Sequence, residues 1–351
     1  MTTTVPLRNK RKTSWKRILP GLAISVIALA VVLYLADLRK MVEALRLADY
    51  RYIALVALTT LVWLGVRTLA WRTLLQEKAT FSQVFLTLNE GYLLNNVLPF
   101  RLGEVGRAFL LGRKANIPFF EVLSTILIER GLDIAFAVGL LLSTLPFVIG
   151  ADWALQAAIA AGGIVLAGLV GFYLLARNRQ WALDQFEKIA HRWPRLGKIG
   201  SRHLPPFLSG LSVLTDGKRF LRVVGWIALD WLIGIVQYYL LLLAFFPTAK
   251  LLWAMFALGV LALGIAVPSS PGSVGVLEAA MVGALSSFGL DLSTSLAAAL
   301  MAHLTQYLVT GVIGIYALAR DGLTLTGLYK DVQDISPGDL SSEDTTPDTL
   351  A

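Results

Sequence analysis

Long apolar blocks, separated by short polar connections, run through most of the sequence. The clear blocks are about 17 to 25 residues long, and an α-helix needs about 20 apolar residues to cross the hydrocarbon of a bilayer. This pattern predicts membrane-spanning helices rather than the buried helices of a soluble core. We expect full spans near residues 18–35, 52–70, 119–146, 153–175, 221–246, 251–267 and 293–318.

Two further apolar stretches, at 84–111 and 268–288, are interrupted by Pro, Gly, polar and charged residues. Pro removes a backbone donor and Gly allows sharp turns, so both residues interrupt membrane helices. We therefore expect broken or re-entrant helices in these two stretches. The predicted fold is an all-α, polytopic transmembrane helical bundle of about seven or eight spans, with two broken or re-entrant segments.

The same pattern divides the chain into three regions. Residues 1–17 form a basic tail, 18–320 form the transmembrane domain, and 321–351 form an acidic tail that we expect to be disordered. The basic connection 178–220 is expected to form amphipathic helices at the membrane surface. Because Lys and Arg concentrate in cytoplasmic connections, we place this connection and the N-terminus on the cytoplasmic side of the cell membrane. The connection 37–51 is expected outside, as an interfacial helix, and the side of the C-terminus stays open.

The composition supports a membrane protein and limits the chemistry that the chain can carry. Charged residues make up 15% of the chain, against about 25% in soluble domains. The sequence has no cysteine and only 3 histidines, none at metal-ligand spacing, so we expect no metal and no cofactor. The net charge of +8 fits basic cytoplasmic connections and does not require nucleic acid. Because the chain also lacks nucleotide-binding, serine-hydrolase and zinc-protease motifs, we do not expect an enzyme.

The two interrupted segments share a short motif. Each contains a Pro, two residues, an aliphatic residue and a Gly, from Pro99 to Gly103 and from Pro271 to Gly275. Paired interruptions in the two halves of a chain indicate a transport site at the interface between two repeats. Helices that start after these glycines would present free N–H groups suited to a phosphate. The alternative is two ordinary interfacial loops whose similarity is chance.

Ionisable residues gather in the first interrupted segment and in the long helix that follows it. Inside a membrane such groups must pair with one another or line an aqueous cavity. We expect Arg130 to pair with Glu104 or Asp133. We expect Arg101 or Arg107 to meet a lipid phosphate. The alternative is a network of salt bridges at the membrane interface that holds the helix ends.

Two later spans also carry polar residues. Asp230 lies inside its span and is expected to face the bundle interior. His303 and Gln306 share one helical face, from which they can bond to the second interrupted segment or to a substrate. The candidate lipid-binding or cavity residues are Asn95, Asn96, Arg101, Glu104, Arg107, Glu129, Arg130, Asp133, Gly275, Glu278 and Gln306.

Five stretches of the chain together give it a family resemblance. They read AWRTLL at 70–75, NNVLPFRLGE at 95–104, IERGLD at 128–133, PSSPGSVGVLE at 268–278 and HLTQY at 303–307. With these stretches the chain resembles the transmembrane, flippase-like domain of the lysylphosphatidylglycerol synthases and the stand-alone proteins built on it. The resemblance extends over roughly residues 18–320, which is nearly all of the predicted folded chain.

The resemblance implies a helical membrane bundle with re-entrant segments that translocates or accommodates an anionic or glycosylated lipid. The aminoacyl-transferring members of the family carry a large soluble C-terminal domain. Here only the tail at 321–351 follows the last predicted span, so lipid aminoacylation is not expected. Phe100 stands where the family more often has Gly, which would narrow the flexibility of that loop.

Three functions follow from these observations. The first, which we favour, is a flippase-like lipid transporter whose partners are membrane lipids. The second is an accessory membrane protein that works beside a separate glycosyltransferase or lipid-modifying enzyme. The third is a membrane-embedded enzyme that acts on lipid-linked sugars and uses Glu104 or Asp133 as a base.

Overall fold

The computed structural model describes residues 19–98, 102–148, 152–192, 194–266 and 270–323, and all regular structure within them is helical. The predicted tail 1–17, nearly all of the predicted tail 321–351 and the motif residues Pro99 and Arg101 lie outside the described residues. The α-helices are α1 (Leu19–Leu35), α2 (Leu38–Leu47), α3 (Tyr50–Leu74), α4 (Phe81–Val97), α5 (Leu102–Ala115), α6 (Phe119–Thr144), α7 (Asp152–Arg177), α8 (Arg179–Arg192), α9 (Pro194–Leu211), α10 (Gly217–Phe245), α11 (Leu251–Ala266), α12 (Val276–Ser286) and α13 (Leu292–Arg320). Three short 3-10 turns join them: η3 (Leu145–Phe147), η4 (Ser212–Thr215) and η5 (Pro271–Ser273).

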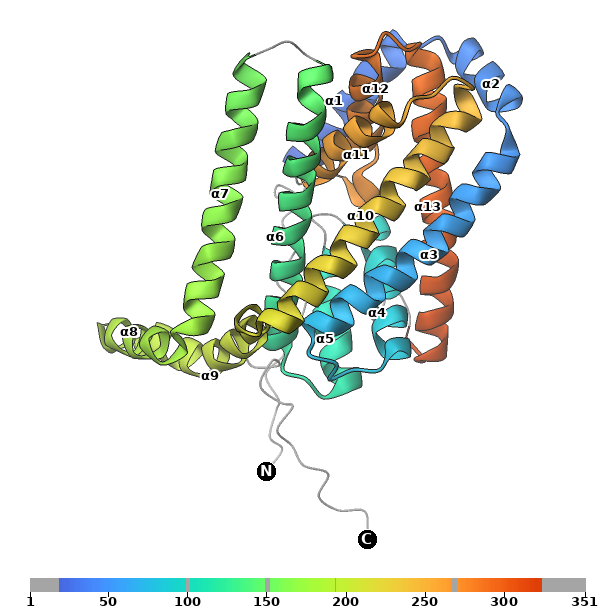
Figure 1. Ribbon diagram of the computed structural model, residues 1–351. Helices are drawn as coiled ribbons and strands as arrows, with labels where there is room; N and C mark the ends of the chain where they lie inside the picture. The colour runs from blue at the N-terminus through green and yellow to red at the C-terminus, as the bar shows by residue number, and fades with distance from the viewer. Residues whose placement is uncertain (1–18, 99–101, 149–151, 193, 267–269, 324–351) are drawn as a thin grey trace.

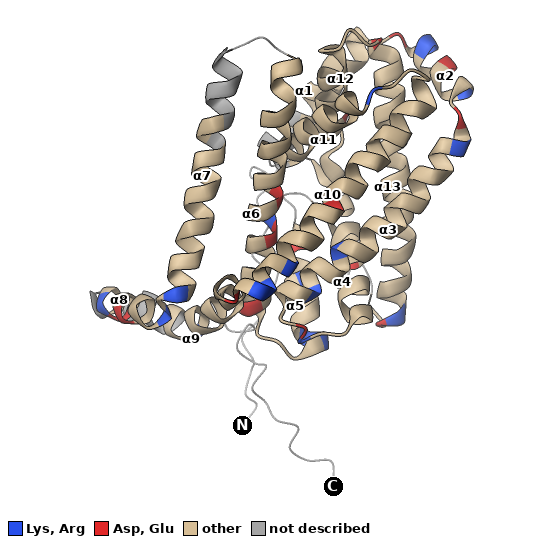
Figure 2. Cartoon of the chain, in the orientation of Figure 1, with Lys and Arg blue, Asp and Glu red and all other residues tan. Residues whose placement is uncertain are grey.

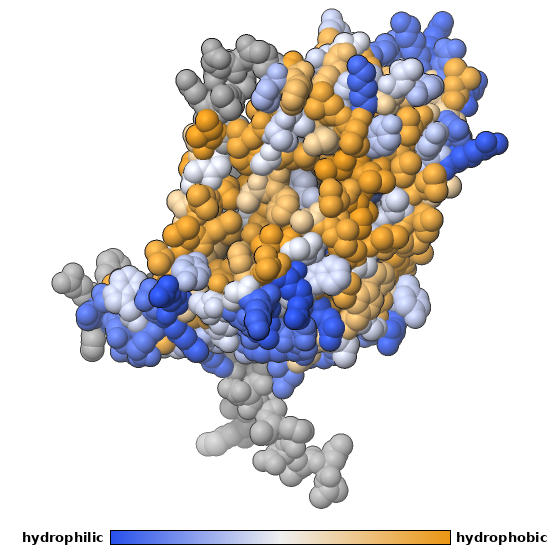
Figure 3. All heavy atoms as spheres, in the orientation of Figure 1, coloured by the Kyte–Doolittle hydropathy of each residue, from blue (hydrophilic) through white to orange (hydrophobic). Residues whose placement is uncertain are grey.

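The outer surface of this bundle is apolar in a way that suits a membrane. Helices α3, α10 and α13 are each long and apolar enough to cross a bilayer. Large aliphatic side chains point outward, including Ile164, which is 75% exposed, and Val312, which is 66% exposed. On the face shown in Figure 3, hydrophobic atoms form a band between two hydrophilic ends. Such an extensive exposed apolar surface is not stable in water, so the predicted all-α membrane bundle is confirmed.

Each interrupted stretch is part of a helical hairpin. Helices α4 and α5 pack against each other, and so do α11 and α12. The second hairpin turns at η5, where Gly272 has φ +66 and Gly275 has φ +87, a backbone region that favours glycine. The stretch 251–267, which we expected to be a separate full span, forms α11 of this hairpin. With 16 residues, α11 is about 24 Å long and is too short to cross the hydrocarbon alone.

The chain uses one helical order twice. Helix α3, the hairpin α4–α5 and α6 are followed later by α10, the hairpin α11–α12 and α13. The two halves are packed into each other: α4 of the first half packs on α13 of the second, and α11 of the second half packs on α6 of the first. Helices α3 and α10 pack closely together. The two hairpins lie at opposite ends of the bundle (Figure 1). This arrangement has the form of an inverted repeat, which is the architecture of many membrane transporters.

Short amphipathic helices lie at both ends of the bundle. Asp37 caps α2 by accepting bonds from the backbone N–H groups of Arg39 and Lys40, as expected for an interfacial helix. At the opposite end, α8 and α9 form the predicted helices of the basic connection (Figure 2). An ion pair between Lys114 and Asp321 joins the last turns of α5 and α13. Helix α13 therefore ends at the same end of the bundle as α8 and α9.

The close approach of α4 and α5 generates a stability prediction. A Cβ atom on Gly103 would lie 2.1 Å from the Gly91 carbonyl oxygen, so Gly103→Ala must push the two helices apart. Overpacking of this kind destabilises by roughly 1–3 kcal/mol, and we expect a lower melting temperature in detergent. Gly65→Ala is the matched control, because nothing lies within 4 Å of that Cβ position and Ala is the better helix former. If Gly103→Ala melts at or above the wild-type temperature, the described hairpin packing is wrong.

Candidate functional site

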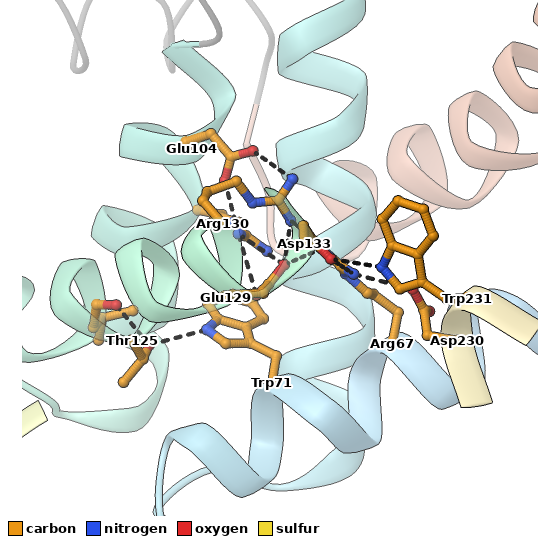
Figure 4. Close-up of polar contacts among 11 residues, drawn as sticks. Arg67, Trp71, Glu104, Thr125, Glu129, Arg130, Asp133, Asp230 and Trp231 are labelled. Carbon is orange, nitrogen blue, oxygen red and sulfur yellow. Dashed lines mark hydrogen bonds and ion pairs between the residues drawn. The ribbon is translucent and has the colours of Figure 1, made fainter. Parts of the chain in front are cut away.

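A buried ionic network lies where α3, α5, α6 and α10 meet (Figure 4). Its central cation is Arg67 of α3, which is 3% exposed. Arg67 Nη1 donates to Asp230 Oδ2 at 3.0 Å and to Asp133 Oδ1 at 2.8 Å. Arg67 Nη2 donates to Glu129 Oε1 at 2.6 Å. One guanidinium therefore joins carboxylates from two other helices, α6 and α10.

Two further arginines complete the network. Arg107 pairs with Glu104 at 2.7 Å and with Glu129 at 3.3 Å. Arg130 pairs with Asp133 at 3.1 Å, with Glu104 at 3.9 Å and closely with Glu129. The predicted pairings of Arg130 are both present. A network of salt bridges, which was the alternative interpretation, is present too, but it lies inside the bundle and beside a cavity.

A buried aromatic side chain packs against the network. The guanidinium carbon of Arg107 lies 4.5 Å from the centroid of the Trp71 ring, a cation–π contact. Trp71 is itself fully buried and donates its indole N–H to Thr125 Oγ1 at 3.1 Å. The stretch 70–75 thus contributes one buried aromatic ring that packs against the Arg107 guanidinium.

The network is formally close to neutral. Among the described residues it contains the three arginines Arg67, Arg107 and Arg130 and the four carboxylates Glu104, Glu129, Asp133 and Asp230. Moving one unpaired ion out of water costs several kcal/mol, and removing a partner leaves that cost uncompensated. Mutual pairing is therefore the condition for placing seven ionisable groups inside an apolar bundle.

A cavity of about 460 Å³ lies beside the network. The side chains of Glu104, Asp133 and Arg130 line it and are 17%, 16% and 26% exposed. Glu129 is fully buried behind them. Residues of η5 and α13 also line the cavity. Polar and aromatic lining groups are Trp63, Arg67, Tyr92, Asn95, Asn96, Glu104, Arg130, Asp133, Asp230, Trp231, Gln237, Tyr238, Ser270, Ser273, His303, Gln306 and Tyr307.

The structure brings most of the predicted site residues together. Six of them line the cavity directly: Asn95, Asn96, Glu104, Arg130, Asp133 and Gln306. Four others lie behind it and hold its lining groups in place: Arg107, Glu129, Gly275 and Glu278. Arg101 lies outside the described residues, so its contact with a lipid phosphate stays a prediction. The same contact proposed for Arg107 also stays a prediction, because its guanidinium is 2% exposed and bonded to Glu104 and Glu129.

One expectation about the helix starts needs correction. The backbone N–H of Gly103 donates to Asn95 Oδ1 at 2.9 Å, and the N–H of Gly275 donates to Glu278 Oε2 at 2.6 Å. Both amides are satisfied within the protein, because each hairpin places an acceptor next to its own glycine. These two amides are therefore not free phosphate donors in this conformation, whereas phosphate binding by the N–H groups that follow them stays a prediction.

Sequence reasoning missed the residue at the centre of the network. Arg67 is a lone arginine within an apolar stretch, 52–70, that reads as an ordinary span. An ionisable residue at that depth in a span is itself a signal of a functional or paired site. Asp230 was expected to face the interior, and its bond to Arg67 shows that it does.

These features define a multi-pass helical membrane protein with a charged cavity between two inverted halves. The family model for the lysylphosphatidylglycerol synthase transmembrane region matches residues 18–314, and the chain belongs to this family. The resemblance predicted from the five sequence stretches is thereby confirmed. No solved structure gives a significant match to the chain.

Curated relatives include archaeal membrane proteins. A UPF0104 membrane protein of Methanothermobacter thermautotrophicus is 26% identical over 332 residues, which cover 88% of this chain and 97% of the relative. A UPF0104 membrane protein of Methanocaldococcus jannaschii is 20% identical, with coverage of 85% and 93%. Glycosyltransferase AglD of Haloferax volcanii is 24% identical over 91% of this chain but only 56% of its own length. The chain thus spans little more than half of that glycosyltransferase.

The position of Arg67 generates a second stability prediction. Arg67→Met leaves Glu129, Asp133 and Asp230 without their shared cation, and loss of one partner from a buried pair costs roughly 3–5 kcal/mol. We expect a large fall in melting temperature in detergent. Adding Asp230→Asn to Arg67→Met removes one uncompensated carboxylate and should restore part of the loss.

The control for this prediction is an exposed pair. Arg222 and Glu77 lie 3.1 Å apart with side chains 57% and 47% exposed, so Arg222→Ala should change stability by at most about 1 kcal/mol. Equal effects of Arg67→Met and Arg222→Ala would contradict a central role for Arg67.

Proposed function

We propose that this protein moves an anionic or glycosylated lipid between the two leaflets of the membrane, with the headgroup passing through the central cavity. The observation that carries the proposal is the cavity itself, because it places ionisable and amide groups inside a bundle whose outer surface is apolar. The family membership supports the same proposal, since this domain is the transmembrane region of enzymes whose product is a lipid.

The physical barrier to lipid movement is the desolvation of the headgroup. A charged or strongly polar group that enters hydrocarbon loses its hydrogen bonds to water, which costs several kcal/mol. Asn95, Asn96 and Gln306 present amide groups to the cavity, and these can replace water as donors and acceptors. A volume of about 460 Å³ lies within the range of small-molecule sites and suits a headgroup whose acyl chains stay outside.

Arg130 is the group that we assign to the lipid phosphate. Of the three network arginines it has the most exposed side chain, 26% against 4% for Arg67 and 3% for Arg107. Its partner Glu104 is 3.9 Å away, a separation that leaves this pair weaker than the others. A phosphate can accept a hydrogen bond from Arg130 Nη1 in place of Glu104, while Glu129 and Asp133 bond to Nη2 and keep the guanidinium oriented.

The inverted halves suggest how the cavity changes sides. In transporters built from inverted repeats, the two halves exchange conformations around a site that stays in place. Here both hairpins, α4–α5 and α11–α12, contribute residues to the lining of the cavity. Opening one hairpin while the other is closed would expose the headgroup to one leaflet at a time.

An accessory role is the second candidate. The Haloferax relative is named a glycosyltransferase, and this chain aligns with 56% of it. In that case the cavity would hold a glycosylated lipid and present it to a separate membrane enzyme without moving it. The transport assay below distinguishes the two roles.

The transport proposal is tested with purified protein in liposomes that contain a fluorescent phosphatidylglycerol, whose inner-leaflet pool is read by quenching with dithionite. We expect lipid equilibration faster than in protein-free liposomes. Arg130→Gln removes a charged hydrogen bond worth about 1.5–3 kcal/mol and should slow equilibration at least about tenfold. Gln306→Leu, which removes one amide from the lining, should slow it several-fold.

Glu43→Gln is the matched control, because Glu43 is exposed on α2 and is not among the residues that line the cavity. Each variant is first checked for a monodisperse gel-filtration profile. The transport proposal fails if the wild type matches protein-free liposomes. Lipid that binds to the wild type and co-purifies with it, but does not equilibrate, would favour the accessory role.

We also propose that α8 and α9 face the cytoplasm of the cell and that α2 faces outward, because the basic connection 178–220 follows the bias of cytoplasmic loops. The chain has no cysteine, so single thiols report topology without background. A membrane-impermeant maleimide should label Glu43→Cys in intact cells and Lys188→Cys only after permeabilisation. The reverse pattern would invert the proposed orientation.

A further inference from the structure

A buried carboxylate–imidazole pair lies outside the ionic network, and its imidazole lines the cavity. Glu278 of α12 is 1% exposed and His303 of α13 is 7% exposed. His303 Nδ1 lies 2.6 Å from Glu278 Oε1, and His303 Nε2 lies 2.9 Å from the carbonyl oxygen of Gly272 in η5. The imidazole thus bridges the start of α12 and the turn that precedes it.

The neighbours of His303 determine how many protons the pair holds. The Gly272 carbonyl can only accept, so Nε2 must carry a hydrogen. Nδ1 then either carries a second hydrogen and faces a carboxylate, or accepts the hydrogen of a protonated Glu278. In both descriptions the pair contains one proton more than a neutral imidazole and a free carboxylate contain together.

Loss of that proton breaks one of the two bonds. A neutral imidazole has a single N–H and can satisfy either the Glu278 carboxylate or the Gly272 carbonyl. The bond to the charged carboxylate is the stronger one, so the hydrogen moves to Nδ1 and the bond to Gly272 is lost. Among the described residues, the hydrogen bond that then remains between α13 and η5 is the one that the Tyr307 hydroxyl donates to the same carbonyl at 2.8 Å.

The turn that this bond holds is constrained by its neighbours. Gly272 has φ +66, and a Cβ atom there would lie 1.4 Å from the Tyr307 hydroxyl, so η5 packs directly on α13. Ser273 in the same turn lines the cavity. A shift of η5 away from α13 therefore changes the shape of the cavity wall.

No other charged side chain is paired with His303 among the described residues. The titratable neighbours on its own side are Glu278 and Tyr307, and α11 contains no ionisable residue. The charges of α2 lie at the exposed end of the bundle. The remaining ionisable groups that face the cavity are Arg67, Tyr92, Glu104, Arg130, Asp133, Asp230 and Tyr238, and the charged ones among them pair with one another.

We propose that Glu278 and His303 form a proton-binding site that couples proton occupancy to the position of η5, and through it to lipid movement. The coupling to lipid rests on the proposed transport function, whereas the proton site itself does not. With the proton bound, His303 holds both α12 and η5, as in the structure described. Without it, η5 is released from His303 and the cavity wall loosens.

The first test reads η5 directly and needs no lipid transport. Ser273→Cys gives this cysteine-free chain a single thiol in η5, and Ser286→Cys gives one on the exposed end of α12. Maleimide labelling of both is measured in detergent at a series of pH values from mildly acidic to mildly alkaline. The labelling rate of Ser273→Cys is divided by that of Ser286→Cys, which corrects for the pH-dependent ionisation of the thiol itself.

We expect this ratio to rise about fivefold from low to high pH, the factor expected for one hydrogen bond. His303→Gln in the Ser273→Cys background should make the ratio independent of pH. A ratio that is flat with His303 present, or one that keeps its pH dependence in His303→Gln, overturns the proton site. If His303→Gln does not give folded protein, Glu278→Gln is measured in the same way with the same expectation.

The second test joins the site to transport. In the liposome assay the wild-type rate of lipid equilibration should change with pH over the same range, and His303→Gln should reduce that change to less than about twofold. Labelling that depends on pH without any lipid movement would support the proton site and refute the transport function. Lipid movement with equal pH dependence in wild type and His303→Gln would refute the coupling alone.

Discussion

The guanidinium of Arg67 bonds to carboxylates on α6 and α10, and the arrangement of the bundle centre depends on it. Helices α3 and α10 pack closely against each other and run side by side in Figure 1. An apolar contact would hold them together with no preferred depth, because lipid and aliphatic side chains are equally apolar. The pairs of Arg67 with Asp133 and Asp230 fix both the depth and the rotation of the three helices. The network thereby keeps polar atoms beside a cavity that hydrocarbon or packed side chains would otherwise fill.

The interrupted hairpins are the second constraint, and they depend on the first. A hairpin that ends within the membrane leaves backbone groups at its turn that must be satisfied by the protein. Asn95 supplies an acceptor for Gly103, and Glu278 supplies one for Gly275. On the next residues of each hairpin, the side chains turn to the neighbouring long helix, where Arg107 meets Glu129 and Glu278 meets His303. Each half therefore uses a similar solution, a short helix that is bonded through a side chain to a neighbouring long helix.

Much of this fold follows from local rules and was predictable from the sequence. Blocks of apolar residues predict helices, and Pro99, Pro271 and Gly275 predict where helices break. The amphipathic connections at 37–51 and 178–220 follow from their periodicity and charge. Two features were not predictable in the same way. The first is that α11 belongs to a hairpin: the sequence predicts a separate full span there, because the pairing of α11 with α12 is a tertiary contact.

The role of Arg67 also depends on contacts between distant parts of the chain. Its partners lie 62, 66 and 163 residues away in sequence, and hydropathy averaged over 52–70 hides a single charge. The cavity was predicted from its charges, and six of the predicted residues line it, but the bonds that occupy the amides of Gly103 and Gly275 appear only in three dimensions. Site chemistry of this kind depends on which acceptor the tertiary structure places within hydrogen-bond distance of each donor.

The two walls of the cavity differ in a way that the inverted fold does not require. The wall formed by α5 and α6 carries arginines, which stay charged at every physiological pH, whereas the wall formed by α12 and α13 carries a histidine–glutamate pair that can exchange a proton. Under the proposed function, a symmetrical frame would let lipid equilibrate in either direction and would supply no direction of its own. A histidine–glutamate pair in one half, with no counterpart in the other, breaks that symmetry, because proton binding to it stabilises one of the two closed hairpins. Under the proposed function, this difference between the walls is where a directional driving force would enter the molecule.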